Sequence, residues 1–288
     1  AYDGEPSAAG MSGEGAIHPL LVPLKPEGSQ SPLFMIHPPG GIVVCYRDLA
    51  RHLAAERPLY GIRSRGLHGY EALPETLAAM AADYVGAIRA RQPEGPYLLG
   101  GWSLGGVIAA EVARQLVGSG EAVDRLLLLD SAIPDSALPP GGDEDSFHAG
   151  REYGLDFDLA ELARMEPEAQ LPFLFDHARK LGLVDESTPP ELVNRVLADL
   201  RTLFAHHVTL CERHRPEWCP IDGVIFRPAE VPFERGGAED RGWSRFLRSV
   251  EVVTVPGHHH SMVSQPHAAA LAAAIAAALA GSPAAVSG

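Results

Sequence analysis

Residues 97–113 read Tyr97-Leu98-Leu99-Gly100-Gly101-Trp102-Ser103-Leu104-Gly105-Gly106-Val107-Ile108-Ala109-Ala110-Glu111-Val112-Ala113. A short apolar run, a Gly-Trp-Ser-Leu-Gly turn and a helical run of small residues follow one another without a break. This order predicts a nucleophile elbow, a sharp strand-to-helix turn that holds a serine hydroxyl above a sheet. Gly101 and Gly105 leave the room that the turn needs, and the helix start beyond it offers N–H groups to an oxyanion. The alternative is a glycine-rich corner in which Ser103 stands by chance.

Apolar runs and amphipathic segments alternate on both sides of this turn. We expect strands at 33–36, 59–62, 97–102, 125–129, 223–226 and 250–255, and helices at 46–55, 76–91 and 267–279. Strands that read as continuous apolar runs between helices are typical of a parallel sheet covered on both faces. The sequence therefore predicts an α/β fold with a mostly parallel central sheet flanked by helices.

The pattern changes near residue 140. Residues 141–215 contain helix-like pieces and no convincing strand, and strand patterns resume after them. We expect a core made of 31–140 and 216–280, with 141–215 as a helical lid inserted over the carboxyl ends of the strands. Residues 1–30 have the composition of an interdomain linker whose apolar end packs on the core, and 281–288 are expected to be a disordered tail.

Composition narrows the class of protein. The chain has 288 residues, 46% of them hydrophobic, and a net charge of −14, with Lys25 and Lys180 as its only lysines. No basic patch is available for phosphates, so we expect no nucleic-acid partner. The sequence shows no membrane-spanning run and no signal-peptide pattern, and Cys45, Cys211 and Cys219 have neither zinc-site nor disulfide-framework spacing. We expect free thiols, a cytoplasmic protein, and no membrane or metal partner.

A serine nucleophile needs a base and a group that orients the base. Asp130 follows the expected strand 125–129, so it should lie on the same edge of a parallel sheet as Ser103. Asp130 could instead only cap the turn that follows. Asp135, on the next loop, is the rival orienter, and Asp124 lies at the wrong end of the strand.

Thirteen histidines compete for the role of the base. His258, His259 and His260 follow a strand and a Pro-Gly turn and precede the last helix, although three adjacent histidines could also be a chance metal-binding run. Side chains in an extended segment alternate in direction, so one of the three is enough to reach Ser103. His37 also ends a strand, but it opens the first turn, where an oxyanion hole is normally built.

The sequence closely resembles the C-terminal (type I) thioesterase domains of nonribosomal peptide synthetases, and the likeness covers residues 30–280. It is carried by Gly95-Pro96-Tyr97, by Gly101 to Gly106 with Glu111 and Leu116, by His37-Pro38-Pro39-Gly40-Gly41 with Tyr46, by Tyr60-Gly61-Ile62-Arg63 with Gly66-Leu67, by Leu129-Asp130, and by Gly257-His258-His259-His260-Ser261-Met262.

The resemblance implies an α/β-hydrolase fold with a helical lid. It implies Ser103 as nucleophile, Asp130 as orienter and His259 as base, because the base is the second residue after the glycine in the family's Gly-x-His-x-x-Met turn. Histidines on both sides of the base depart from the family, which often has a small polar residue and an aromatic there. The oxyanion hole would be the backbone N–H groups of Leu104 and Gly40, with Gly41 as the next candidate.

The resemblance also implies a function. Ser103 would accept a peptidyl or peptidyl-polyketide chain from the phosphopantetheine thioester of an upstream carrier protein, and release it by macrocyclisation or hydrolysis. Residues 1–30 would then be the linker from that carrier domain, the isolated domain would be monomeric, and it would bind no cofactor of its own. The alternatives are a stand-alone editing thioesterase, a small acyl-ester hydrolase, and a non-catalytic module that docks on a carrier. Trp102 beside the nucleophile fits the peptide-synthetase branch better than the editing enzymes.

Overall fold

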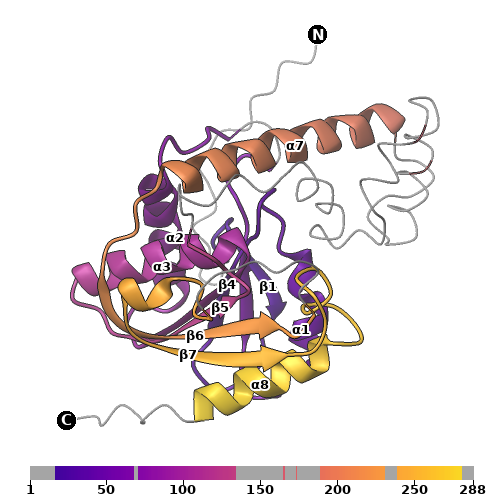
Figure 1. The fold of residues 1–288 in the computed structure, drawn as a ribbon. Helices are drawn as coiled ribbons and strands as arrows, with labels where there is room; N and C mark the ends of the chain where they lie inside the picture. Colours follow the sequence, from indigo (N-terminus) through magenta and orange to yellow (C-terminus); the bar gives the residue numbers. More distant parts are fainter. Residues whose placement is uncertain are drawn as a thin grey trace.

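A seven-stranded sheet forms the centre of the protein (Figure 1). The computed structural model describes residues 17–67, 71–133, 165, 173, 189–230 and 239–280. The strands are β1 (Leu21–Lys25), β2 (Leu33–Ile36), β3 (Leu59–Ile62), β4 (Tyr97–Trp102), β5 (Val123–Leu129), β6 (Cys219–Pro228) and β7 (Leu247–Val255). Their order is β1-β3-β2-β4-β5-β6-β7, with β1 antiparallel to β3 and all other neighbours parallel. This confirms the predicted α/β fold.

Helices cover both faces of the sheet. They are α1 (Arg47–His52), α2 (Leu77–Arg91), α3 (Leu104–Gly118), α7 (Pro190–Arg213) and α8 (Ala268–Ala280), with short 3₁₀ helices η1 (Val44–Tyr46) and η3 (Trp243–Arg245). Successive strand residues face opposite sides. Leu126 and Leu128 of β5 pack with α2 and α3, whereas Leu127 and Leu129 pack with α1 and α8. Each central strand is therefore buried on both faces, which is why it reads as a continuous apolar run.

The sheet begins earlier in the chain than the sequence indicates. β1 lies within residues 1–30, the segment expected to be a linker, and forms the edge of the sheet beside β3. Its pairing is irregular between Pro23 and Lys25. Proline is tolerated in a strand at an edge or bulge, and this proline hides the strand pattern in the sequence.

The end of the predicted lid packs on the core. Within 141–215 the structure describes Met165, Phe173 and residues 189–215, so most of the expected lid, including the helices at 159–165 and 169–181, lies outside the described residues. The expected helix at 190–214 is α7. Leu210 and Cys211, in its last turns, are buried with the α2 and α3 side of the core. Figure 1 shows this end of α7 close to α2. Residues 1–16 and the expected tail at 281–288 also lie outside the described part.

Candidate active site

Four segments with polar side chains meet at the carboxyl edge of the parallel strands. His37 follows β2, Ser103 follows β4, Asp130 follows β5, and the turn with His259 follows β7. β2, β4 and β5 are consecutive neighbours in the sheet. In open α/β sheets this edge is where ligands bind, so the topology alone gathers the candidate residues into one region.

The backbone at Ser103 has the geometry of a nucleophile elbow. Its φ of 55° and ψ of −128° are strained for a residue with a side chain, and its N–H donates to the Leu129 carbonyl at 2.9 Å. A Cβ on Gly101 would come within 2.1 Å of the Gly105 backbone, and a Cβ on Gly105 within 2.6 Å of the Ile36 carbonyl oxygen. The two glycines are required because strand, helix and the end of β2 approach one another too closely for any larger residue.

Asp130 and His259 form a hydrogen bond. Nδ1 of His259 lies 2.7 Å from Oδ2 of Asp130, and the other carboxylate oxygen accepts a hydrogen bond from Arg241 at 2.9 Å. Burial alone raises the pKa of the Asp130 carboxyl, but the bond from His259 and the charge and bond of Arg241 outweigh it and lower the pKa overall. An ionised Asp130 holds the proton on Nδ1 of His259, so Nε2 is the unprotonated nitrogen that can act as a base.

The three histidines of the last turn have different surroundings. His259 carries the bond to Asp130, and its ring lies 5.3 Å from the ring of Trp102, whose Nε1 donates to the His259 carbonyl at 3.1 Å. The N–H of His258 donates to Ser261 Oγ, and the His258 carbonyl accepts from the N–H of Ser261. The ring of His260 meets the His259 ring edge-on at 4.9 Å. Trp102, the residue before Ser103, is thus bonded directly to the turn that carries His259.

The candidate oxyanion donors lie on two elements. Leu104 is the first residue of α3, where helix N–H groups lack intrahelical acceptors. Gly40 and Gly41 lie in the turn after β2: the Gly40 N–H donates to Nδ1 of His207 at 3.2 Å, and the Gly41 N–H donates to the Pro38 carbonyl at 3.2 Å. In this structure both glycine N–H groups are therefore engaged by the protein itself.

A buried tyrosine connects the two elements. The hydroxyl of Tyr46 donates to the Ile36 carbonyl at 2.6 Å and accepts the N–H of Trp102 at 2.9 Å. Tyr46 is fully buried, and burial raises the pKa of its hydroxyl, so the proton that this arrangement needs stays in place. Because Ile36 ends β2 and Trp102 ends β4, Tyr46 sets the distance between the first turn and the elbow.

Sequence reasoning missed three side chains at this edge. Arg241 lies far from Asp130 in the chain and carries no local pattern that indicates the contact. Tyr46 contributes to the family resemblance, but its sequence position does not indicate its two backbone partners. His207 lies in the segment expected to be a lid and reaches the first turn through long-range packing of α7. Asp135, the rival orienter, lies outside the described residues, and Asp124 lies at the amino end of β5, as expected.

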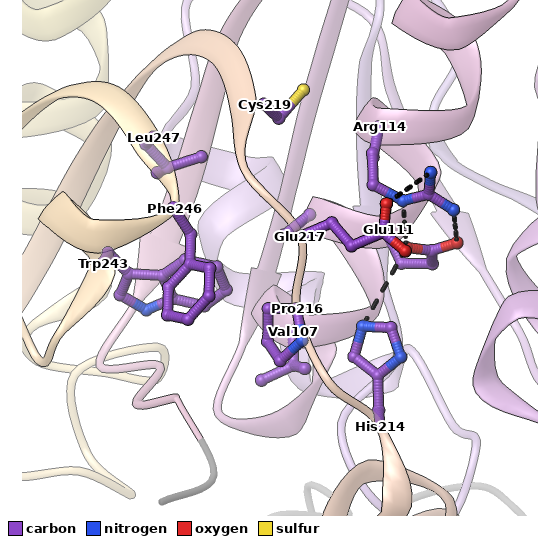
Figure 2. Close-up of a pocket in the computed structure, with 11 residues that line it drawn as sticks. Val107, Glu111, Arg114, His214, Pro216, Glu217, Cys219, Trp243, Phe246 and Leu247 are labelled. Atoms are coloured by element: carbon purple, nitrogen blue, oxygen red, sulfur yellow. Dashed lines mark hydrogen bonds and ion pairs between the residues drawn. The ribbon is translucent and has the colours of Figure 1, made fainter.

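A small pocket lies away from this edge, against α3 (Figure 2). Trp243 and Phe246 form its apolar side, and on the other side Glu111 accepts two hydrogen bonds from Arg114, both at 2.7 Å. His214, next to the end of α7, lies 3.9 Å from the same carboxylate. The network holds the end of α7 against α3, so we assign it a structural role.

Three further observations concern the residues that the structure describes. No group of three or more potential metal ligands occurs within the described ranges. None of the helices in this part of the chain is long and apolar enough to cross a membrane. None of the three cysteines, Cys45, Cys211 and Cys219, forms a disulfide, as the sequence predicts, and all three are buried.

The sheet and the serine elbow define a serine hydrolase of the α/β-hydrolase type. The family model "Thioesterase domain" matches residues 31–172. The dimodular nonribosomal peptide synthase of Bacillus subtilis (strain 168) is 32% identical over 249 residues, which are 84% of this chain and 10% of that protein. The chain belongs to the thioesterase domain family, and its relatives include nonribosomal peptide synthetases.

Solved structures agree with this identification. The covalent complex of the NocB thioesterase domain with a fluorophosphonate nocardicin G analog is 28% identical, with a TM-score of 0.65, over 90% of this chain and 99% of that one. The holo form of a four-domain nonribosomal peptide synthetase bound to AMP and glycine is 26% identical, with a TM-score of 0.66, over 90% of this chain and 20% of that one. The predicted fold and family are confirmed.

Proposed function

We propose that this thioesterase releases a peptidyl chain from the phosphopantetheine thioester of a carrier protein, with Ser103 as nucleophile, His259 as base and Asp130 as orienter. The observation that carries the proposal is the 2.7 Å bond between Asp130 and His259, which lies at the strand edge that also carries the strained elbow of Ser103. Peptide synthetases among the relatives support the substrate class.

The first step forms an acyl-enzyme. Ser103 Oγ attacks the thioester carbonyl while Nε2 of His259 takes the hydroxyl proton, and the carbon–sulfur bond then breaks as the same proton passes to the leaving thiolate. Asp130 stabilises the imidazolium that exists in between, and its lowered pKa keeps it ionised for that task. Backbone N–H groups of Leu104 and Gly40 would stabilise the oxyanion. All reacting groups belong to the chain or arrive with the substrate, so the chemistry needs no further cofactor.

The second step releases the product. His259 activates either water, which gives the linear acid, or a hydroxyl or amine of the bound chain itself, which gives a ring. An internal nucleophile competes with water through proximity, worth up to ~10⁵–10⁸ M when it is well oriented. We propose that residues 141–215 shape the space in which this competition is decided.

The test is turnover of a synthetic peptidyl thioester, first as a small-thiol ester and then loaded on a carrier protein, with product masses resolved into linear acid, lactam and lactone. We expect release that is lost in Ser103→Ala. If the chain hydrolysed only short acyl esters and misloaded acetyl carriers, it would be an editing thioesterase or a small-ester hydrolase.

Point variants test the choice of base. His259→Ala should lose about 10³-fold or more in turnover, because only the oxyanion hole and binding remain. His258→Ala and His260→Ala should each lose roughly tenfold at most. The bonds of His258 to Ser261 come from its backbone and remain in the alanine variant, and His260 packs on the His259 ring. A greater loss at either flanking histidine would move the role of base to that residue.

A further inference from the structure

His207 joins α7 to the first turn of the active-site edge through both of its ring nitrogens. Nδ1 accepts the N–H of Gly40 at 3.2 Å, and Nε2 lies 2.9 Å from Ser64 Oγ. Because Nδ1 accepts, the ring proton is on Nε2 and is donated to Ser64, whose hydroxyl donates to the Arg65 carbonyl at 2.7 Å. Each member of this chain of hydrogen bonds has a defined direction.

The surroundings keep His207 neutral and in place. It is fully buried, and its ring lies 4.7 Å from the ring of His37. Burial, together with the neighbouring histidines His37 and His206, lowers the pKa of His207 well below its ordinary value. On the same helix, His206 binds the Pro74 carbonyl at 2.9 Å. These contacts anchor this part of α7 to the core.

The turn that His207 contacts has two possible peptide orientations. Pro38 to Gly41 form a β-turn closed by the bond from the Gly41 N–H to the Pro38 carbonyl, and Gly40 has a φ of 91°. A positive φ at the third position defines a type II turn, which differs from type I by a flip of the central peptide. Here that peptide joins Pro39 to Gly40, so the flip would exchange the direction of the Gly40 N–H with that of a carbonyl oxygen.

We infer that His207 is a positioning residue that selects this orientation and so presents the Gly40 N–H as an oxyanion donor. The inference rests on the proposed function, because it assigns Gly40 to the oxyanion hole. A bond of 3.2 Å to a neutral nitrogen is at the long end of the usual range. An anionic oxygen is the stronger acceptor, and hydrogen bonds to charged groups are about twice as strong as neutral ones. The oxyanion can therefore take over the Gly40 N–H from His207 after a small tilt of the same peptide, whereas the bond to His207 beforehand prevents the full flip that would turn this N–H away.

The opposite possibility is that His207 blocks the donor. In that case α7 or the ring would have to move before Gly40 could act, and removal of the imidazole would speed acylation. The anchoring of α7 and the bonding of both ring nitrogens favour positioning. Kinetics separate the two possibilities.

Two substitutions of similar size form a matched pair. Asn places a polar atom close to the position of Nδ1, so His207→Asn retains an acceptor for the Gly40 N–H, whereas His207→Leu has the same branching and no acceptor. We expect His207→Leu to lose about 10–100-fold in kcat, less than the 10²–10³-fold for complete removal of an oxyanion donor, with KM changed by about threefold or less. His207→Asn should recover kcat to within about threefold of the parent. Ser64→Ala, which leaves Nδ1 in place, should also stay within about fivefold.

Parent-like or faster turnover by folded His207→Leu would overturn the inference, and so would equal impairment of the Asn and Leu variants. A second measurement does not depend on how the variants fold. In the parent, ¹⁵N spectra of labelled histidine should show His207 with an unprotonated Nδ1 and a protonated Nε2; the reverse tautomer would overturn the inference. If the parent protein is not acylated at Ser103, the proposed function is refuted. The tautomer measurement still tests the role of His207 in that case.

Discussion

Removal of the Tyr46 hydroxyl should destabilise the fold and impair the active-site edge together. Tyr46→Phe takes away the donor to the Ile36 carbonyl at 2.6 Å and the acceptor of the Trp102 N–H at 2.9 Å, in a place that water does not reach. A buried N–H left without an acceptor costs about 1–3 kcal/mol, and the second hydrogen bond contributes about 1 kcal/mol. The free energy of unfolding should therefore fall by about 2–4 kcal/mol.

Urea unfolding measures this change, with the dependence on urea concentration expected to stay the same. Tyr97→Phe is the matched control, because Tyr97 begins β4, the strand that ends at Trp102. Its hydroxyl donates to the carbonyls of Gln92 and Pro93 at 3.2 Å in a partly buried place, so its loss should cost about 1 kcal/mol or less. Peptidyl thioester turnover should fall in Tyr46→Phe and not in Tyr97→Phe. Equal losses of stability in the two variants, or full activity in folded Tyr46→Phe, would refute the reasoning.

Three other substitutions probe the charges of the site. Asp130→Asn should lose turnover by up to ~10⁴-fold in a steady-state thioester assay, because an amide favours the wrong tautomer of His259, as in other Ser-His-Asp triads. Arg241→Met removes a cation that lies against Asp130 and so opposes protonation of the neighbouring His259. The acid side of the kcat/KM profile, which protonation of the base sets, should therefore move to higher pH, and a profile that stays in place would show that Arg241 serves the fold alone. Burial lowers the pKa of His37 to about 4 from its ordinary 6.5. Between these two pH values the unfolded chain binds a proton that the folded chain does not, so the free energy of unfolding decreases as the pH falls through this window. His37→Gln should therefore lose ~2 kcal/mol less than the parent between pH 7 and pH 5 in urea unfolding, and an identical loss in both proteins would contradict this assignment.

The parts of the fold that the sequence reveals are those with local patterns. β4, the elbow and α3 follow one another in the chain, so their order and their glycines are legible without any long-range information. β5 was predictable because a strand buried on both faces is a continuous apolar run. β1 was not, because a proline interrupts an edge strand whose pairing is irregular.

The residues of the candidate site also divide into those that local patterns predict and those that only tertiary packing brings together. Ser103, Asp130 and His259 each follow a strand, so topology places them at one edge, and the order of strands alone brings the aspartate next to the serine. The contacts of Arg241 and His207 depend on segments that join the core from more than 100 residues away, and no periodicity indicates them. Such residues can be found only from tertiary packing.

The central claim is that Ser103 is the nucleophile of this thioesterase, and covalent labelling tests it most directly. A serine-directed phosphonate should add one equivalent of mass to the folded protein, and the label should map to the peptide that contains Trp102 and Ser103. Ser103→Ala should take up no label, while His259→Ala should react much more slowly because the hydroxyl keeps its proton. Undiminished labelling of Ser103→Ala, or a label mapped to Ser64 or another serine, would contradict the account.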